Sequence, residues 1–394
     1  MEEKTKMPAE MWRPIDRKIT ENEKTDRKKR CHWSDGWASF KRARLAMAGL
    51  LFASFLVLTA FLGPLFFEAS MSDQNLKLAS IPPVLEIYSL GQDNFAYVHR
   101  EYKLIQVTEK GQILGRFKPE EDNLKDRFRT YSIEGVDVKL DYSPAGEGKD
   151  KRYILTVGQR EIFPIEKVYN KTYLFGTDNF GRDLFIRVIY GARISLSIAF
   201  AATIVNLFIG VFYGGISGLA GGRMDEMMMR FVDMASAIPM ILYVILLTLA
   251  IGSGTGSIVL AMGMVYWVHM ARIVRGQVLS IKKKDYVSAA RISGAGWWRI
   301  MTKHLIPNTM GPIIVAMAAT IPGAIFTEAF LSFIGLGVPA PQASWGTLVN
   351  DALYGIGLYG YQLFFPSAAI CLTMLAFNFI SDGARDAMDP TSRI

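Results

Sequence analysis

Cysteine and histidine are both scarce in this sequence, and neither is arranged as a site. The two cysteines, Cys31 and Cys371, lie in a basic segment and an apolar segment, which excludes a disulfide framework. The four histidines are scattered and show no metal-ligand spacing. The sequence also lacks a Gly-x-x-x-x-Gly-Lys-Ser/Thr phosphate loop, so any ATP must be hydrolysed elsewhere. We expect no metal site and no catalytic residue in this chain.

Apolar residues dominate the composition. They make up 51% of the 394 positions, and the mean hydropathy is +0.20, which is too apolar for an ordinary soluble domain. Charge is concentrated in certain segments, so we predict a membrane protein that carries soluble parts. The formal net charge is +8, for which a nucleic-acid partner is one interpretation. The location of the basic residues argues against that partner, as the loops below indicate.

Six apolar segments are long enough to cross a membrane, because a hydrocarbon core of ~30 Å requires ~20 helical residues. They lead us to expect an all-α polytopic membrane protein with six transmembrane helices and both termini on one side. The predicted spans are residues 45–67, 194–219, 231–251, 258–274, 310–333 and 362–380.

Lysine and arginine are distributed unevenly among the loops. The loops after the second and fourth apolar segments are basic, whereas stretches 252–257 and 332–361 contain no lysine or arginine. Short basic loops remain in the cytoplasm, so the basic loops should be inside and the others outside. A basic N-terminal arm, residues 1–44, precedes the first span and should also be cytoplasmic. The positive charge therefore indicates membrane topology, with lipids and no nucleic acid as expected partners.

Residues 69–170, between the first two spans, have a different composition. Val136, Val138 and Leu140 alternate with charged residues, and residues 104–114 suggest a hairpin, which together favour β-strands. We predict a small β-rich insert outside the membrane. It could be an elaborated loop that shields neighbouring surfaces, or it could receive a partner protein.

A glycine-rich, charged string follows the insert. Asp178, Arg182 and Asp183 are close enough in sequence to pair around Gly181 and fix a reentrant turn on the outer surface. A structural role for these charges is favoured over contact with a substrate. We place the start of the second span near Ser195. The string comprises Gly176, Thr177, Asp178, Gly181, Arg182 and Asp183.

The stretch 285–308 separates two apolar segments and organises the chain. Ala289 and Ala290 give a helical turn a small-residue face, and Gly294 permits a turn that a Cβ would hinder. Pro307 is expected to end or kink the helix that follows. A basic loop that binds lipid head groups is the alternative.

These motifs resemble those of the dipeptide, oligopeptide and nickel permease family of ATP-binding-cassette (ABC) importers. The glycine-rich string looks like the family's GTDxxGRD signature, and stretch 285–308 resembles its EAA loop, which docks on an ATPase subunit. Ser288 replaces the glutamate of that pattern and His304 takes an isoleucine position. The residues that the resemblance assigns to ATPase coupling are Ser288, Ala289, Ala290, Gly294, His304 and Pro307.

The resemblance implies a type I ABC importer permease fold for residues 175–390 and a multi-pass protein of the bacterial cytoplasmic membrane. It further implies the transmembrane subunit of an ATP-driven peptide importer. The expected partners are a related permease subunit, two cytoplasmic ATPases that use ATP and Mg²⁺, and an extracytoplasmic binding protein. Import of nickel or another small solute is an alternative within the family. An ion-coupled transporter and a membrane-anchored sensor or scaffold are alternatives outside it.

Two acidic residues lie within the predicted spans. Glu328 lies about 27 Å along the fifth span at ~1.5 Å per residue, near the outer boundary, where a pathway gate or a structural contact suits it better than a proton relay. Asp233 lies near the inner boundary, and we expect it to pair with Arg230 or to reach the membrane surface.

Overall fold

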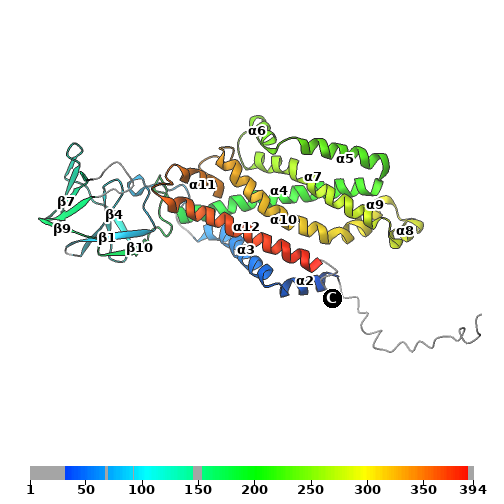
Figure 1. Ribbon diagram of the computed structural model, residues 1–394, viewed down its shortest axis with the longest axis horizontal. Coiled ribbons are helices and arrows are strands. Elements are labelled where there is room, and N and C mark those ends of the chain that lie inside the picture. The colour runs from blue at the N-terminus through cyan, green and yellow to red at the C-terminus, as the bar shows by residue number, and fades with distance from the viewer. Residues whose placement is uncertain (1–31, 67–69, 92, 145–152, 389–394) are drawn as a thin grey trace, which may run out of the picture.

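The computed structural model describes residues 32–66, 70–91, 93–144 and 153–388. The molecule is elongated, with a β-rich part at one end of a helical bundle (Figure 1). The short helices α8 and α9 lie at the opposite end of the bundle. The predicted class, a helical membrane protein with a β-rich insert, is confirmed.

Among the residues that the structure describes, five helical segments are long and apolar enough to cross a membrane. Short helices flank them: α2 (His32–Arg42), η2 (Gly63–Leu65), η3 (Leu76–Leu78), α8 (Asp285–Ile292) and α11 (Trp345–Leu353). The long helices are α3 (Arg44–Leu62), α4 (Leu184–Ala220), α7 (Thr255–Ile281), α10 (Ile306–Phe333) and α12 (Gly360–Met388). The turns α9 (Trp297–Arg299) and η4 (Ile300–Leu305) continue directly into α10.

The third predicted span, residues 231–251, is not one straight helix. It is divided between α5 (Gly222–Ala237) and α6 (Met240–Ile251), whose axes differ by 80°. Ile238, at the break, has an extended backbone because Pro239 disfavours a helical conformation in the residue before it. The two helices are long and apolar enough for a span only when taken together, so the described residues contain five candidate spans, or six if the bent pair counts as one.

Two other expectations, for Ser195 and Pro307, need correction. The second span starts at Leu184, about ten residues before Ser195, because the Asp183 side chain caps the helix there. Pro307 does not end a helix, since α9, η4 and α10 run on through it as one helical segment, and a kink at this position stays a prediction. The π-helical turn η4 precedes it.

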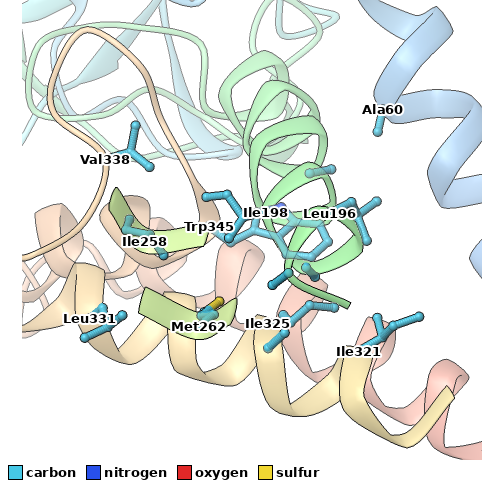
Figure 2. Packing of buried hydrophobic residues seen from close by; sticks show 14 of the residues in the cluster. Ala60, Leu196, Ile198, Ile258, Met262, Ile321, Ile325, Leu331, Val338 and Trp345 are labelled. Atoms are coloured by element: carbon cyan, nitrogen blue, oxygen red, sulfur yellow. The ribbon is translucent and has the colours of Figure 1, made fainter. Parts of the chain in front are cut away.

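The core of the bundle lies where α4, α7 and α10 meet, next to the segment that joins α10 to α11 (Figure 2). Trp345 is fully buried in this core, and its indole Nε1 donates to the carbonyl of Val188 at 3.0 Å. This bond satisfies a donor that would otherwise be costly away from water. The labelled core residues are Ala60, Leu196, Ile198, Ile258, Met262, Ile321, Ile325, Leu331, Val338 and Trp345.

Three glycines spaced four residues apart let α4 and α7 approach closely. A Cβ on Gly210 would lie 2.5 Å from Met270 Cβ, and one on Gly214 would lie 2.3 Å from the Ala271 carbonyl oxygen. Gly218 faces the Arg275 carbonyl in the same way, at 3.0 Å. Small residues with this spacing bring membrane helices into van der Waals contact, which stabilises their association in lipid.

The insert consists of two antiparallel five-stranded sheets, and their facing side chains form a shared core. The first sheet has the order β10-β1-β2-β3-β4 and the second β5-β6-β7-β8-β9. Strand bounds in the first sheet are β1 (Val84–Gly91), β2 (Asn94–Val98), β3 (Leu104–Val107), β4 (Ile113–Arg116) and β10 (Glu166–Tyr169). In the second they are β5 (Glu121–Asn123), β6 (Phe128–Ile133), β7 (Val136–Asp141), β8 (Ile154–Val157) and β9 (Arg160–Ile162).

The first and last strands of the insert pair with each other. Val84 on β1 lies opposite Tyr169 on β10, so the chain enters and leaves the insert side by side. The predicted hairpin is present as β3 and β4, and the alternating residues 136–141 form β7. Because the two ends of the insert are adjacent, the insert can lie between the first two spans while those spans stay next to each other.

Candidate functional site

Residues 285–308 fold as a short helix, a turn and a second helix, as the sequence predicted. Helix α8 ends at Ile292, and Gly294 follows with a φ of +84°, a conformation that strains any residue with a Cβ. The Ala295 N–H donates to the carbonyl of Ala290 at 3.0 Å and closes the turn. A tight elbow thus joins α8 to the helix that continues into α10.

This helix-turn-helix has one buried face and one exposed face. Val287, Ile300 and Met301 are buried against residues of α4, α7 and α10. On the other face Ser288 and Ala289 are exposed, and Ile292 is 88% exposed. An aliphatic side chain that is almost fully in water at the end of a bundle is a feature of surfaces that bind partners.

The predicted coupling residues divide between two parts of this element. Ser288, Ala289, Ala290 and Gly294 lie together on α8 and its turn. His304 is half-buried on η4 and Pro307 is exposed at the start of α10. Trp298, which the sequence analysis did not single out, is 56% exposed and stacks on Phe212 with ring centroids 6.2 Å apart.

An ion pair between Arg275 and Asp225 was not predicted from the sequence. Arg275 on α7 donates to both carboxylate oxygens of Asp225 on α5, at 2.6 and 2.7 Å. Ser217 on α4 donates to the same carboxylate at 2.5 Å. The pair fixes the start of the bent helix pair against α4 and α7, and it could not be predicted because its members lie 50 residues apart.

Of the two expectations for Asp233, the pairing with Arg230 is wrong, and its reach to the membrane surface stays a prediction. Asp233 instead accepts a hydrogen bond from Arg272 on α7, at 2.8 Å, and Arg272 also donates to Ser236. The long side chain of Arg272 reaches across from the neighbouring helix, so a contact between two helices takes the place of the local one.

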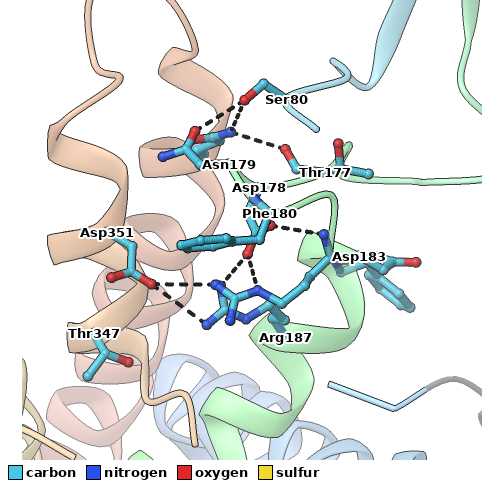
Figure 3. A network of polar contacts seen from close by, with 12 residues as sticks. Ser80, Thr177, Asp178, Asn179, Phe180, Asp183, Arg187, Thr347 and Asp351 are labelled. Carbon is cyan, nitrogen blue, oxygen red and sulfur yellow. Dashed lines mark hydrogen bonds and ion pairs between the residues drawn. The ribbon is translucent and has the colours of Figure 1, made fainter. Parts of the chain in front are cut away.

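At the opposite end of the bundle, the glycine-rich string forms a turn around a buried carboxylate (Figure 3). Asp178 is 6% exposed and accepts hydrogen bonds from the backbone N–H of Phe180 and of Arg182, both at 2.9 Å. Its other oxygen accepts from Arg182 Nε at 2.7 Å and from the Arg187 guanidinium at 2.5 Å. Asp178 and Arg182 therefore pair as predicted.

Asp183 does not join these pairs, which corrects the expectation that it would. Its carboxylate accepts from the backbone N–H groups of Phe185 and Ile186, at 2.8 and 3.3 Å, and so caps α4. Burial raises the pKa of Asp183, and the two backbone hydrogen bonds oppose that rise. The second carboxylate near the arginines is Asp351, which lies 3.7 Å from Arg187 and 3.9 Å from Arg182.

The same turn joins the insert to the bundle. Thr177 Oγ1 donates to the carbonyl of Leu78 at 2.6 Å, and the Thr177 N–H donates to the carbonyl of Ile81 at 2.9 Å. Tyr361 at the start of α12 donates its hydroxyl to the Thr177 carbonyl at 2.8 Å. Gly176 and Gly181 also touch the backbone that enters the insert, where a Cβ would come within 2.4 Å of a carbonyl oxygen.

Glu328 is fully buried among hydroxyl groups. Its carboxylate accepts from Ser195 on α4 and from Ser332 on α10, each at 2.8 Å. Ser195 in turn accepts from the backbone N–H of Trp345 at 3.2 Å. In this conformation Glu328 links α10 and α4 and, through Ser195, the start of α11. Of the two roles considered, a pathway gate or a structural contact, these bonds favour the structural contact. A place beside the solute pathway stays a prediction.

Within the described ranges, no group of three or more histidine, cysteine, aspartate or glutamate side chains could hold a metal ion.

Comparison with known proteins supports the resemblance. Residues 207–394 match the family described as "Binding-protein-dependent transport system inner membrane component", and residues 32–83 match "N-terminal TM domain of oligopeptide transport permease C". The chain is 52% identical over 228 residues to the oligopeptide transport system permease protein OppC of Bacillus subtilis (strain 168). That match covers 58% of this chain and 75% of the relative.

A second relative is the dipeptide transport system permease protein DppC of the same organism. It is 52% identical over 220 residues, which cover 56% of this chain and 69% of the relative. Among solved structures, an inward-facing MetNI methionine ABC transporter is similar with a TM-score of 0.45 and 18% identity. That likeness covers 52% of this chain and 98% of the other. From the sequence relatives and the membrane-spanning helices, the chain belongs to the family of binding-protein-dependent inner-membrane permeases, as the transmembrane subunit of a peptide importer of the ABC class.

Proposed function

We propose that α8 and its turn are the coupling element through which a partner ATPase moves this subunit. The observation that carries the proposal is the exposed face of α8 at the free end of the bundle, with Ile292 88% exposed. Two small residues, Ala289 and Ala290, allow close approach of another protein surface. The buried face, through Val287 and Met301, connects the same element to three spans.

The coupling end of the bundle is proposed to face the cytoplasm. The loop that contains α8 is rich in lysine and arginine, which favours retention inside. Helix α2, close to the N-terminus, and the end of α12 lie at this end of the bundle as well, whereas the insert lies at the other (Figure 1). Both termini would then be cytoplasmic and the insert extracytoplasmic.

A related permease subunit is proposed as the second half of the membrane complex. Two faces of the bundle present large apolar side chains, represented by Phe55 on α3, 61% exposed, and Leu249 on α6, 80% exposed. Lipid or another membrane subunit would cover such faces. By family likeness the partners are a paralogous permease, two ATPases and an extracytoplasmic binding protein that delivers peptide.

The chain itself is proposed to carry out no chemistry. It has no phosphate loop, so ATP and Mg²⁺ would be bound and consumed by the ATPase partners. Closure of the ATPases would push α8, and the packed helices would rock as largely rigid bodies between inward- and outward-open states. The tight contact of α4 with α7 would carry the displacement towards the outer end.

A charge placed on the coupling face tests this proposal. The changes Ala290→Arg and Gly294→Glu should each lower the amount of ATPase that copurifies with the complex by about tenfold, which corresponds to about 1.4 kcal/mol of binding free energy. Peptide uptake should fall in parallel. The matched control is Gly135→Glu in the insert, because Gly135 has a φ of +79° and, like Gly294, no atom within 4 Å of the position that a Cβ would take. Normal assembly and uptake with both coupling variants would refute the coupling role.

A further inference from the structure

A cavity of about 690 Å³ lies between the insert and the segment that leads into α12. One wall comes from β1, β2 and β10, and the other from residues 358–361. Sites for small ligands in proteins are commonly of ~300–1,000 Å³. The space is therefore suited to a molecule of a few amino-acid residues rather than to the face of a folded partner.

Tyrosine side chains line the cavity from both walls. Tyr97 and Tyr153 belong to the insert, and Tyr359 and Tyr361 to the bundle. Tyr153 shares a hydrogen bond of 2.8 Å with the hydroxyl of Tyr88, and burial raises the pKa values of Tyr97 and Tyr153. These phenols stay neutral at physiological pH. Rigid aromatic faces with polar tips bind varied side chains at a small cost in conformational entropy.

Two side chains of opposite charge line the insert wall of the cavity, Arg100 just after β2 and Glu86 on β1. The guanidinium of Arg100 lies 5.7 Å from the centre of the Tyr359 ring, and no ion pair joins it to a carboxylate in the described part of the chain. On β1, the 45% exposed side chain of Glu86 pairs with Lys167 at 3.0 Å. An exposed guanidinium that is not paired with a carboxylate can donate hydrogen bonds to an anionic ligand.

A metal ion fits the cavity poorly. The only imidazole in its lining is His99, whose two ring nitrogens are both engaged: Nδ1 accepts from the Glu101 N–H at 3.2 Å and Nε2 lies 3.3 Å from the Ser80 carbonyl. His99 is 4% exposed, and burial lowers its pKa, which favours the neutral ring held by these two contacts.

We propose that this cavity binds a short peptide, with the peptide's C-terminal carboxylate on Arg100 and its side chains between the tyrosines. The N-terminal amine would lie towards Glu86. The inference rests on the assignment of the chain to a peptide importer and adds a place on the permease where peptide is held outside the membrane. The insert would then take part directly in handling the substrate.

Fluorescence anisotropy tests the proposal with the full transporter complex in lipid nanodiscs and no binding protein. The probe is a pentapeptide with free termini and fluorescein on a central lysine side chain, compared with the same peptide amidated at its C-terminus. Arg100→Gln should weaken binding of the free acid about tenfold, as expected for one charge-assisted hydrogen bond, and should change binding of the amide little. Amidation alone should weaken binding to the unchanged complex by a similar factor.

Arg160→Gln is the matched control, because Arg160 is exposed on β9 in the same insert and does not line the cavity. It should leave both affinities unchanged. The proposal fails if the unchanged complex does not bind the free acid, or if Arg100→Gln weakens acid and amide equally. It also fails if Arg100→Gln leaves binding of the free acid unchanged in this assay and instead reduces copurification of the binding protein in a separate experiment, which would make this surface a protein docking site. None of these failures would affect ATPase copurification, which tests the coupling element separately.

Discussion

Replacing Asp178 with alanine is expected to destabilise the subunit by about 3–5 kcal/mol, the usual cost of removing one partner of a buried ion pair. Asp178 is 6% exposed and forms ion pairs with both Arg182 and Arg187, whose side chains are also buried. Without it, two guanidinium groups would stay buried near a single, looser carboxylate. The amount of folded protein in the membrane and the melting temperature in detergent should both fall.

Asp351→Ala is the control for this change. The Asp351 side chain is 48% exposed and lies 3.7–3.9 Å from the same arginines, so its loss should cost no more than about 1 kcal/mol. Adding Arg187→Met to Asp178→Ala should recover part of the stability, because one unpaired charge is removed. If Asp178→Ala and Asp351→Ala lowered the stability equally and only slightly, Asp178 would not be the carboxylate that holds this turn together.

Substituting alanine for Gly214 is expected to separate α4 from α7, whereas the same change at the adjacent Gly215 should be harmless. The new Cβ at 214 would lie 2.3 Å from the Ala271 carbonyl oxygen, which is backbone and cannot move alone. Overpacking of this kind costs about 1–3 kcal/mol. At 215 the nearest atom, Met301 Sδ, lies at 3.5 Å, an ordinary contact.

Thermal unfolding of the two purified variants gives a direct comparison. Alanine favours a helix over glycine by about 1 kcal/mol, so Gly215→Ala should melt at or above the temperature of the unchanged protein. Gly214→Ala should melt lower and, if the helix contact transmits motion, should also reduce ATP-driven uptake. Indistinguishable melting of the two variants would show that the close approach of α4 and α7 is not needed for stability.

The elements that the sequence predicted well are those set by local patterns. Apolar runs located the spans because hydrocarbon thickness fixes their length, and period-two alternation located β7. Gly294 indicated the turn after α8 because few residues other than glycine adopt a positive φ.

The contacts that escaped prediction depend on tertiary packing. Arg272 lies 39 residues from Asp233 and displaced the nearer Arg230, since helix packing decides which side chains meet. Arg187 reaches Asp178 only because α4 begins at Leu184. The sequence did not indicate this start, because the first turns of α4 contain polar residues that do not look like part of a membrane span. The division of the insert into two sheets follows from strand partners that no local pattern identifies.

The side of the membrane that α8 faces can be measured directly. In a chain whose Cys31 and Cys371 have been changed to serine, Ile292→Cys would place a reactive thiol on the 88% exposed position of the coupling element. A membrane-impermeant maleimide should label this chain in inside-out vesicles only, and bound ATPase should block the labelling. Labelling in right-side-out vesicles, or labelling that the ATPase does not affect, would contradict a cytoplasmic coupling element.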